Sequence, residues 1–218
     1  MAYVVGLTAT DGCLFTGVRK LNFKSQDRDL VGIYLRLLGR TNRIKEQLTR
    51  SGRIAYFAEF HDSRLYEWFR SIGLMPRKSL ILGQLDVPDE FLFAAVRGLL
   101  DGDGSIINKV YLADTGGRPD YYWEYLITSF GSASRRHLEW LESRVRAVTG
   151  LHGRIGEATR RVPDATRHPY YQLRYGKLAS HALLPLLYPS YDVPCLERKR
   201  AIWVRYRDRV IRSDESLE

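Results

Sequence analysis

Apolar and polar positions alternate along the segment that begins at Lys20. Lys20, Asn22 and Lys24 fall on one side, and Leu21 and Phe23 fall on the other. This period of two predicts a β-strand with one buried face and one polar, mostly cationic face.

The chain after this strand changes to a helical period. Residues 27–39 repeat their apolar positions every three or four residues, which predicts an amphipathic helix with Asp27 at its N-cap and Gly39 at its end. Two strands joined by the turn 50–53 are expected next, and a second helix follows over residues 63–73.

The second half of the chain repeats this order of elements. Strands are predicted over residues 105–113, 121–130, 151–158 and 170–175, and helices over residues 134–150, 177–187 and 195–210. We expect Ser134 to cap the first of these helices and Pro185 to kink or shorten the second. With the helix that opens each half, both halves are predicted to run helix, two strands, helix, two strands, helix.

The opening helix of each half ends in Asp-Gly. The stretches "YVVGLTATDGCL" and "AAVRGLLDGDGSI" align when Gly6 is placed on Gly98, and Asp11 then falls on Asp103. A single ending of this kind is an ordinary cap and turn. Two copies, each at the head of the same order of elements, predict a site to which both halves contribute.

Small residues recur four positions apart on both opening helices: Gly6 and Thr10 on the first, Gly98 and Gly102 on the second. Residues at this spacing share one helical face, and their small size lets two helix backbones approach closely. We therefore expect the two helices to pack together and to bring the two Asp-Gly ends side by side. Two carboxylates at negative helix ends repel each other, and a divalent cation would relieve that repulsion.

Composition adds the class of partner. The 218 residues contain 34 Lys and Arg against 25 Asp and Glu, which gives a net charge of +9, and 27 of the 34 are arginine. Arginine binds phosphates and guanine edges through its planar fork, so a nucleic acid is the expected partner.

The two cysteines, Cys13 and Cys195, lie far apart and indicate neither a disulfide framework nor a zinc site. No apolar run approaches a membrane span of ~18 residues, and no signal peptide is recognisable, so an intracellular protein is expected.

The two motifs resemble the LAGLIDADG signature of homing endonucleases. "VRGLLDGDG" at 96–104 matches it well, whereas "VVGLTATDG" at 4–12 departs at its centre. The resemblance covers nearly the whole chain and implies an α+β fold of two pseudo-symmetric α-β-β-α-β-β-α repeats. Each repeat would hold a four-stranded antiparallel sheet, and the two would pack through the motif helices. Residues 1–84 and 85–218 would be the N-terminal and C-terminal repeats of a monomer, the second with an extended C-terminal helix.

The resemblance also implies a metal site. Mg²⁺ would be the natural ion and Mn²⁺ a substitute, while Ca²⁺ would support DNA binding without cleavage. Asp11 and Asp103 would be ligands, and the backbone carbonyls of Thr10 and Gly102 would be further ligands. Asp101 has no acidic counterpart in the first motif, so we interpret it as a local cap or an ion-pair partner.

Three polar residues complete the expected catalytic set. In this family a basic residue follows the third helix of each repeat, and Lys78 and Lys199 match that place. They would offset negative charge on the reacting phosphate or order water, although a solvated basic patch is an alternative. Gln26, at the end of the second strand, would position the attacking water, and Ala133 takes its place in the second repeat.

The polar faces of the predicted sheets are the expected DNA-binding surface, because Arg, Lys, Asn and Gln read base edges in the major groove. In the first half these residues are Lys20, Asn22, Lys24, Arg43, Lys45 and Gln47. In the second half they are Lys109 (or Asn108, since the face is ambiguous), Arg154, Gln172 and Arg174, and the loop residues Arg160, Arg161 and Arg167 would hold phosphates. Unequal halves imply a pseudo-palindromic target of about two helical turns.

The function expected from these features is site-specific hydrolysis of double-stranded DNA. One alternative on the same fold is an RNA maturase with intron RNA as its partner. Another is a DNA-binding protein that does not cleave, and a third is an unrelated basic α+β protein. The presence of both Asp11 and Asp103 favours cleavage, because a protein that only binds has no physical reason to keep both acids.

Overall fold

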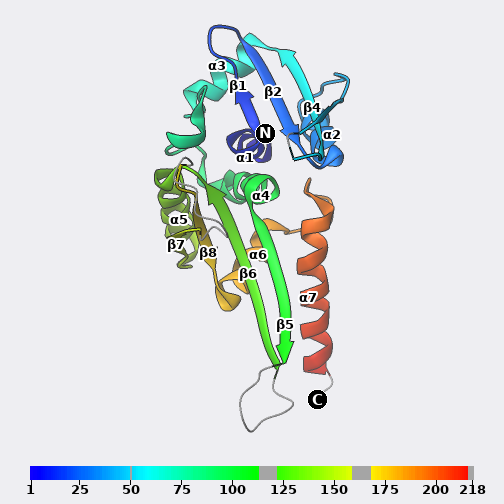
Figure 1. Ribbon diagram of the computed structural model, residues 1–218. Coiled ribbons are helices and arrows are strands. Elements are labelled where there is room, and N and C mark those ends of the chain that lie inside the picture. The colour runs from blue at the N-terminus through cyan, green and yellow to red at the C-terminus, as the bar shows by residue number, and fades with distance from the viewer. Residues whose placement is uncertain (50, 113–121, 159–167, 216–218) are drawn as a thin grey trace.

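Two similar sets of helices and strands follow each other in the computed structural model, which describes residues 1–49, 51–112, 122–158 and 168–215, with side chains described as far as residue 210 (Figure 1). The first set is α1 (Ala2–Thr10), β1 (Gly12–Leu14), β2 (Lys20–Ser25), α2 (Arg28–Leu37), β3 (Lys45–Leu48), β4 (Ile54–His61) and α3 (Ser63–Ser71). The second set is α4 (Leu92–Asp103), β5 (Ser105–Leu112), β6 (Tyr122–Ser132), α5 (Arg135–Thr149), β7 (Arg154–Glu157), β8 (Tyr171–Tyr175), α6 (Lys177–Leu187) and α7 (Glu197–Glu215). Two short 3-10 helices, η1 (Lys78–Leu80) and η2 (Asp89–Phe91), lie between the sets.

Both sheets have the same topology. Their strand orders are β1-β2-β4-β3 and β5-β6-β8-β7, and every neighbouring pair is antiparallel. The same permutation in each half is the mark of a pseudo-symmetric pair. The predicted α+β fold of two repeats is therefore confirmed.

The core runs through the two opening helices. Residues of α1 and α4 such as Val4, Leu7, Val96 and Leu100 are completely buried where these helices lie side by side between the two sheets (Figure 1). Within the described residues, helices cover only one face of each sheet. In the first sheet, for example, Phe23 of β2 stacks on Tyr34 of α2 with ring centroids 4.2 Å apart. The other face of each sheet remains open.

Three local expectations need correction. Asp27 and Ser134 do flank the N-termini of α2 and α5, but neither side chain caps its helix. The Asp27 carboxylate pairs instead with Arg198, and the Ser134 hydroxyl donates to the Leu82 carbonyl at 2.6 Å. Pro185 does not shorten its helix either, since α6 continues to Leu187. For Asp27 and Ser134 a tertiary partner overrides the local capping rule. Among the described residues, no helix is long and apolar enough to cross a membrane.

Candidate active site and nucleic-acid interface

The crossing of α1 and α4 is a backbone-to-backbone contact. A Cβ atom added to Gly6 would lie 2.1 Å from the Ala95 carbonyl oxygen, and one added to Gly98 would lie 2.2 Å from the Tyr3 carbonyl oxygen. Further along the helices, a Cβ atom on Gly102 would lie 1.9 Å from the Thr10 hydroxyl. Only glycine allows helices to approach this closely, so the small residues bring the two Asp-Gly ends together.

Two carboxylates lie at these helix ends. Among the residues that the structure describes, none donates a hydrogen bond to the side-chain carboxylate of Asp11 or of Asp103. Burial, and to a smaller extent the neighbouring Asp103, raise the pKa of Asp11 to about 7, although Lys199 and Lys78 act in the opposite direction. Asp103 is exposed, yet the surrounding protein removes enough hydration to raise the pKa of its carboxyl as well. The two carboxyl groups are thus close enough to repel each other, and the positive charges of Lys78 and Lys199 offset this repulsion only in part.

Lys78 caps the C-terminal end of α1. Its side chain is only 6% exposed, and its ammonium donates to the carbonyls of Thr10 (3.2 Å) and Gly12. The preceding residue, Arg77, has a φ of 54° and is the one non-glycine residue with positive φ in the described chain. That left-handed conformation costs about 1–2 kcal/mol and turns the chain so that Lys78 faces inward. Burial lowers the pKa of Lys78.

Lys199 does the same for α4. It is 4% exposed, and its ammonium donates to four main-chain carbonyls near the helix end: Leu100 (2.7 Å), Asp101 (2.8 Å), Gly102 (3.2 Å) and Gly104 (2.8 Å). Burial lowers its pKa to about 8. A cation at the negative end of a helix is favourable, so each lysine stabilises the end that carries one acid. The alternative of a solvated basic patch is therefore wrong, because both ammonium groups are buried.

Asp101 connects the halves. It is 1% exposed, and its Oδ2 accepts from the Tyr3 hydroxyl at 2.7 Å and from the Leu196 backbone N–H at 2.8 Å. Its interpretation as a local cap or ion-pair partner needs correction, because both donors lie more than 90 residues away in sequence. Leu196 immediately precedes α7, so Asp101 fixes the start of the helix that carries Lys199.

Gln26 lies at the exposed end of β2. That strand runs beside the first acid, since the Lys24 N–H donates to the Asp11 carbonyl at 3.3 Å. The Gln26 side-chain oxygen accepts from Arg53 at 3.2 Å. Next to it, Asp27 forms a two-pronged ion pair with Arg198 at 2.9 and 2.7 Å, which ties the first half to α7.

The donor set at the helix ends suits a hard cation with an incomplete protein shell. No cluster of three or more His, Cys, Asp or Glu residues occurs within the described part of the chain. The local oxygen donors are the two carboxylates and the carbonyls of Thr10 and Gly102, and each of those carbonyls also accepts from a lysine. Mg²⁺ commonly uses one or two carboxylates and completes its shell with water and substrate phosphate, so the residues fit this ion.

The first open sheet face is polar. The strand registers place Lys20, Asn22 and Lys24 on it, and Lys45 and Gln47 of β3 share it, while Arg43 is exposed just before β3. Glu59, which was not among the predicted interface residues, lies among these cations. Glu59 pairs with Lys20 at 3.0 Å and with Lys45 at 3.8 Å, and its alternation within β4 was the available signal.

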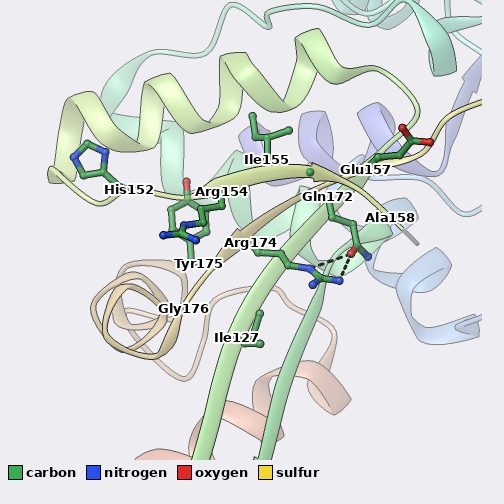
Figure 2. Close-up of a pocket in the computed structure, with 11 residues that line it drawn as sticks. Ile127, His152, Arg154, Ile155, Glu157, Ala158, Gln172, Arg174, Tyr175 and Gly176 are labelled. Carbon is green, nitrogen blue, oxygen red and sulfur yellow. Dashed lines mark hydrogen bonds between the residues drawn. The ribbon is translucent and has the colours of Figure 1, made fainter. Parts of the chain in front are cut away.

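The second open face holds two arginines side by side. Arg154 lies directly opposite Arg174 in the β7–β8 register, and Arg174 lies opposite Ser129. Both arginines line a depression of about 620 Å³. Figure 2 shows the Arg174 guanidinium beside Gln172, to which it donates hydrogen bonds. Like charges directly opposite each other are unfavourable in a sheet, and an anion would relieve that repulsion.

The remaining interface residues divide into placed and unplaced ones. Lys109 shares the open face, because its partner Tyr125 is two positions along β6 from Ile127, which lines the same depression. Asn108 instead lies on the helix-covered face and bonds Glu124 and Arg209. Arg160, Arg161 and Arg167 lie outside the described residues.

Comparison with known proteins supports the fold. No family model matches the sequence, and no curated protein matches it. Solved structures do match. I-SmaMI, a LAGLIDADG homing endonuclease bound to cleaved DNA, has a TM-score of 0.59 and 12% identity over 99% of this chain and 90% of its own. I-WcaI bound to its DNA recognition sequence has a TM-score of 0.58 and 11% identity over 91% and 84%. I-DmoI in complex with DNA and Ca has a TM-score of 0.55 and 16% identity over 92% and 95%.

Proposed function

We propose that this chain, which has the fold of LAGLIDADG homing endonucleases, is a site-specific double-stranded DNA endonuclease. The observation that carries the proposal is the pair Asp11 and Asp103 on abutting helix ends: their carboxylates accept no hydrogen bond from the described residues and have raised pKa values. A pair held at this energetic disadvantage is typical of a functional site. The DNA contacts of I-SmaMI and I-WcaI, on the same fold, support the choice of substrate.

The cation in this proposal is Mg²⁺, with Mn²⁺ as a substitute. Asp11 and Asp103 would hold it, with the carbonyls of Thr10 and Gly102 as secondary donors. When bound, such an ion stabilises the attacking and leaving oxygens of a phosphodiester. A complex of I-DmoI with DNA and Ca fits the expectation that Ca²⁺ supports binding.

Lys78, Lys199 and Gln26 would position the reacting groups and offset negative charge at the site. Lys78 and Lys199 hold the two helix ends in place and add positive charge close to both acids. They would offset negative charge at the reacting phosphate. Gln26 would orient the attacking water from the end of β2, and its bond to Arg53 limits its movement.

Binding would use both open sheet faces, one for each half-site. A β-sheet face with outward Lys, Arg, Asn and Gln suits the major groove. Because residues 1–84 and 85–218 would each cover one half-site and carry different side chains, the target would be long and pseudo-palindromic. One chain holds both halves, so a monomer would suffice.

The test begins with a target selected from a random duplex library by binding in Ca²⁺. Cleavage of that target in Mg²⁺ is then measured for wild type, Asp11→Asn and Asp103→Asn. Either substitution should abolish cutting of both strands, while affinity in Ca²⁺ survives, because each removes a charged ligand at almost constant size. Asp29→Asn is the matched control: it makes the same change at an exposed position of α2 and should cleave normally.

Other outcomes select other functions. Wild type that binds the target but never nicks it in Mg²⁺ or Mn²⁺ would be a DNA-binding protein without cleavage. Preference for structured RNA over duplex DNA would support the maturase. Cleavage by the Asp11→Asn, Asp103→Asn double variant would refute the proposed active site.

A further inference from the structure

The outer part of the second open face differs chemically from the first. Its outward residues on β5 and β6 form three cross-strand rows, Ile107 with Ile127, Lys109 with Tyr125, and Tyr111 with Trp123. We call the five apolar and aromatic residues of these rows, all except Lys109, the apolar ladder. Ile107 is 38% exposed, Tyr125 46% and Tyr111 47%. On the first face the outward residues of β2 are Lys20, Asn22 and Lys24, and Lys20 is the one that corresponds to a ladder residue, Ile127.

The ladder belongs to the open face of the sheet. Ile106 and Leu126, which alternate with it, are 4% and 0% exposed and face the helices. The next row toward the active site is Ser105 with Ser129, and Ser129 lies opposite Arg174. Figure 2 shows Ile127 on the same side of the sheet as Arg174. The ladder thus continues the arginine surface outward from Asp103, along the hairpin that projects from the body of the protein (Figure 1).

The spacing of the ladder matches duplex DNA. Rows on one face are two residues apart, which is ~6.8 Å at about 3.4 Å per residue. That distance is close to two base-pair steps of about 3.4 Å. Consecutive rows can therefore meet successive pairs of base edges along a groove.

Only one base edge in the major groove is apolar, the C5-methyl group of thymine. We propose that the apolar ladder recognises thymine methyl groups in the outer part of the second half-site, so that the two half-sites are read by different chemistry. This inference rests on the proposed function. Arg154 and Arg174 supply positive charge on the same face, and the ladder itself contributes apolar contact.

The side chains favour a duplex over stacked single-stranded bases. The row nearest the arginines is aliphatic and offers no ring on which a base could stack. In the outer rows, the rings of Tyr111 and Tyr125 meet edge to face, with centroids 5.6 Å apart and planes at 83°. Stacking platforms present open ring faces to successive bases, whereas these rings partly cover each other.

The experiment replaces thymine by deoxyuridine, which lacks the methyl group but pairs identically. Each thymine of the selected target is replaced singly, and the affinity of the full chain is measured in Ca²⁺. In the outer second half-site each replacement should weaken binding about fourfold, the equivalent of one buried methyl group at ~0.8 kcal/mol. In the first half-site the effect should stay below about twofold.

A variant identifies the residues responsible. In Ile107→Ser, Ile127→Ser, the thymine and deoxyuridine targets should bind equally at the facing positions, because the apolar partner is gone. Val148→Ser, at an exposed apolar position of α5 on the helix-covered side of the second sheet, is the matched control and should keep the full sensitivity. Circular dichroism verifies that each variant is folded.

Several results would overturn the inference. A selected target without thymine in the outer second half-site, or equal deoxyuridine effects in both half-sites, removes it while leaving the proposed function intact. Tight binding of single-stranded uridine-rich RNA that is lost in Tyr125→Ala would assign the ladder to stacking instead. A chain that binds no duplex at all would overturn the proposed function itself.

Discussion

The crossing of α1 and α4 can be tested with a single methyl group. Gly98→Ala places a Cβ atom 2.2 Å from the Tyr3 carbonyl oxygen, whereas non-bonded heavy atoms prefer about 3.5 Å. The obstacle is backbone on the opposite helix, so the methyl group cannot be accommodated by rotating a side chain. The helices must separate by roughly 1 Å.

The expected cost follows from two opposing effects. Overpacking costs ~1–3 kcal/mol, and the upper end applies because backbone must move. Alanine returns about 1 kcal/mol through its higher helix propensity. The net loss of ~2 kcal/mol should lower the melting temperature by about 4–8 °C in a chain of this size.

Gly32→Ala is the matched control. Gly32 lies within α2, and a Cβ atom there would meet nothing within 4 Å. The same substitution should therefore raise the melting temperature by about 2–4 °C. Thermal unfolding followed by circular dichroism compares the two variants directly.

Cleavage supplies a second measurement. A separation of ~1 Å between the helices displaces Asp11 relative to Asp103, and a misplacement of that size can cost about a hundredfold in rate. Gly32→Ala should cleave like wild type. If Gly98→Ala melts as high as Gly32→Ala and cleaves at the same rate, the helix crossing does not position the acids as described.

Three further predictions concern charge, burial and assembly. Without divalent metal, wild type should lose stability relative to Asp11→Asn as the pH rises from about 4 to about 8. The pKa of Asp11 is raised to about 7 in the folded chain, so the folded chain keeps a proton that the unfolded chain has already released in this range. Urea unfolding of both proteins at each pH measures the difference in stability, and a difference that does not change with pH would contradict the prediction. Tyr3→Phe should cost about 1–3 kcal/mol in urea unfolding, because it removes one of the two donors to the buried Asp101 carboxylate, and a loss near zero would show that this bond contributes nothing. Light scattering should give a single species near the chain mass of 25.2 kDa, and a species of twice that mass would argue against a monomer.

Local pattern predicted the elements and their order, because strand and helix periods depend on neighbouring residues alone. It also predicted which face of β2 carries Lys20, Asn22 and Lys24, since alternation fixes the face. Pattern failed where a distant partner decides. The Asp27 carboxylate leaves its helix for Arg198, which is 171 residues away in sequence, and no local rule contains that distance.

The site shows the same division. The small residues of the motif helices predicted a close crossing, and the structure has one: a Cβ atom added to Gly6 or Gly98 would clash with the backbone of the opposite helix. The sequence could not show that the ammonium groups of Lys78 and Lys199 donate to carbonyls at the helix ends, because this requires both side chains to be buried by tertiary packing. Glu59 was not predicted for another reason: the cationic pattern of β2 gives no sign of an acid on the neighbouring strand β4 that pairs with it.

The two halves reach one arrangement by different means, which explains why their motifs differ. In the first half the capping ammonium follows a left-handed Arg77, and local backbone geometry directs it to the end of α1. In the second half it lies on α7, which must be anchored to α4 by tertiary contacts. Asp101 supplies one anchor through the Leu196 N–H, and Arg97 supplies another through the carbonyls of Leu187 and Pro194.

The first motif needs no such anchor, so Ala9 can stand where the second motif has an acid. Asp101 also accepts from the Tyr3 hydroxyl, so the same carboxylate that anchors α7 joins α4 to α1. Its second oxygen has no hydrogen-bond partner among the described residues, and burial raises its pKa. Burying a carboxyl group with one unpaired oxygen lowers the stability of the fold. Asp101 compensates for this cost by fixing the position of the C-terminal end of α4. That position sets where Asp103 lies relative to Asp11, so the asymmetry of the motifs serves the symmetry of the acid pair.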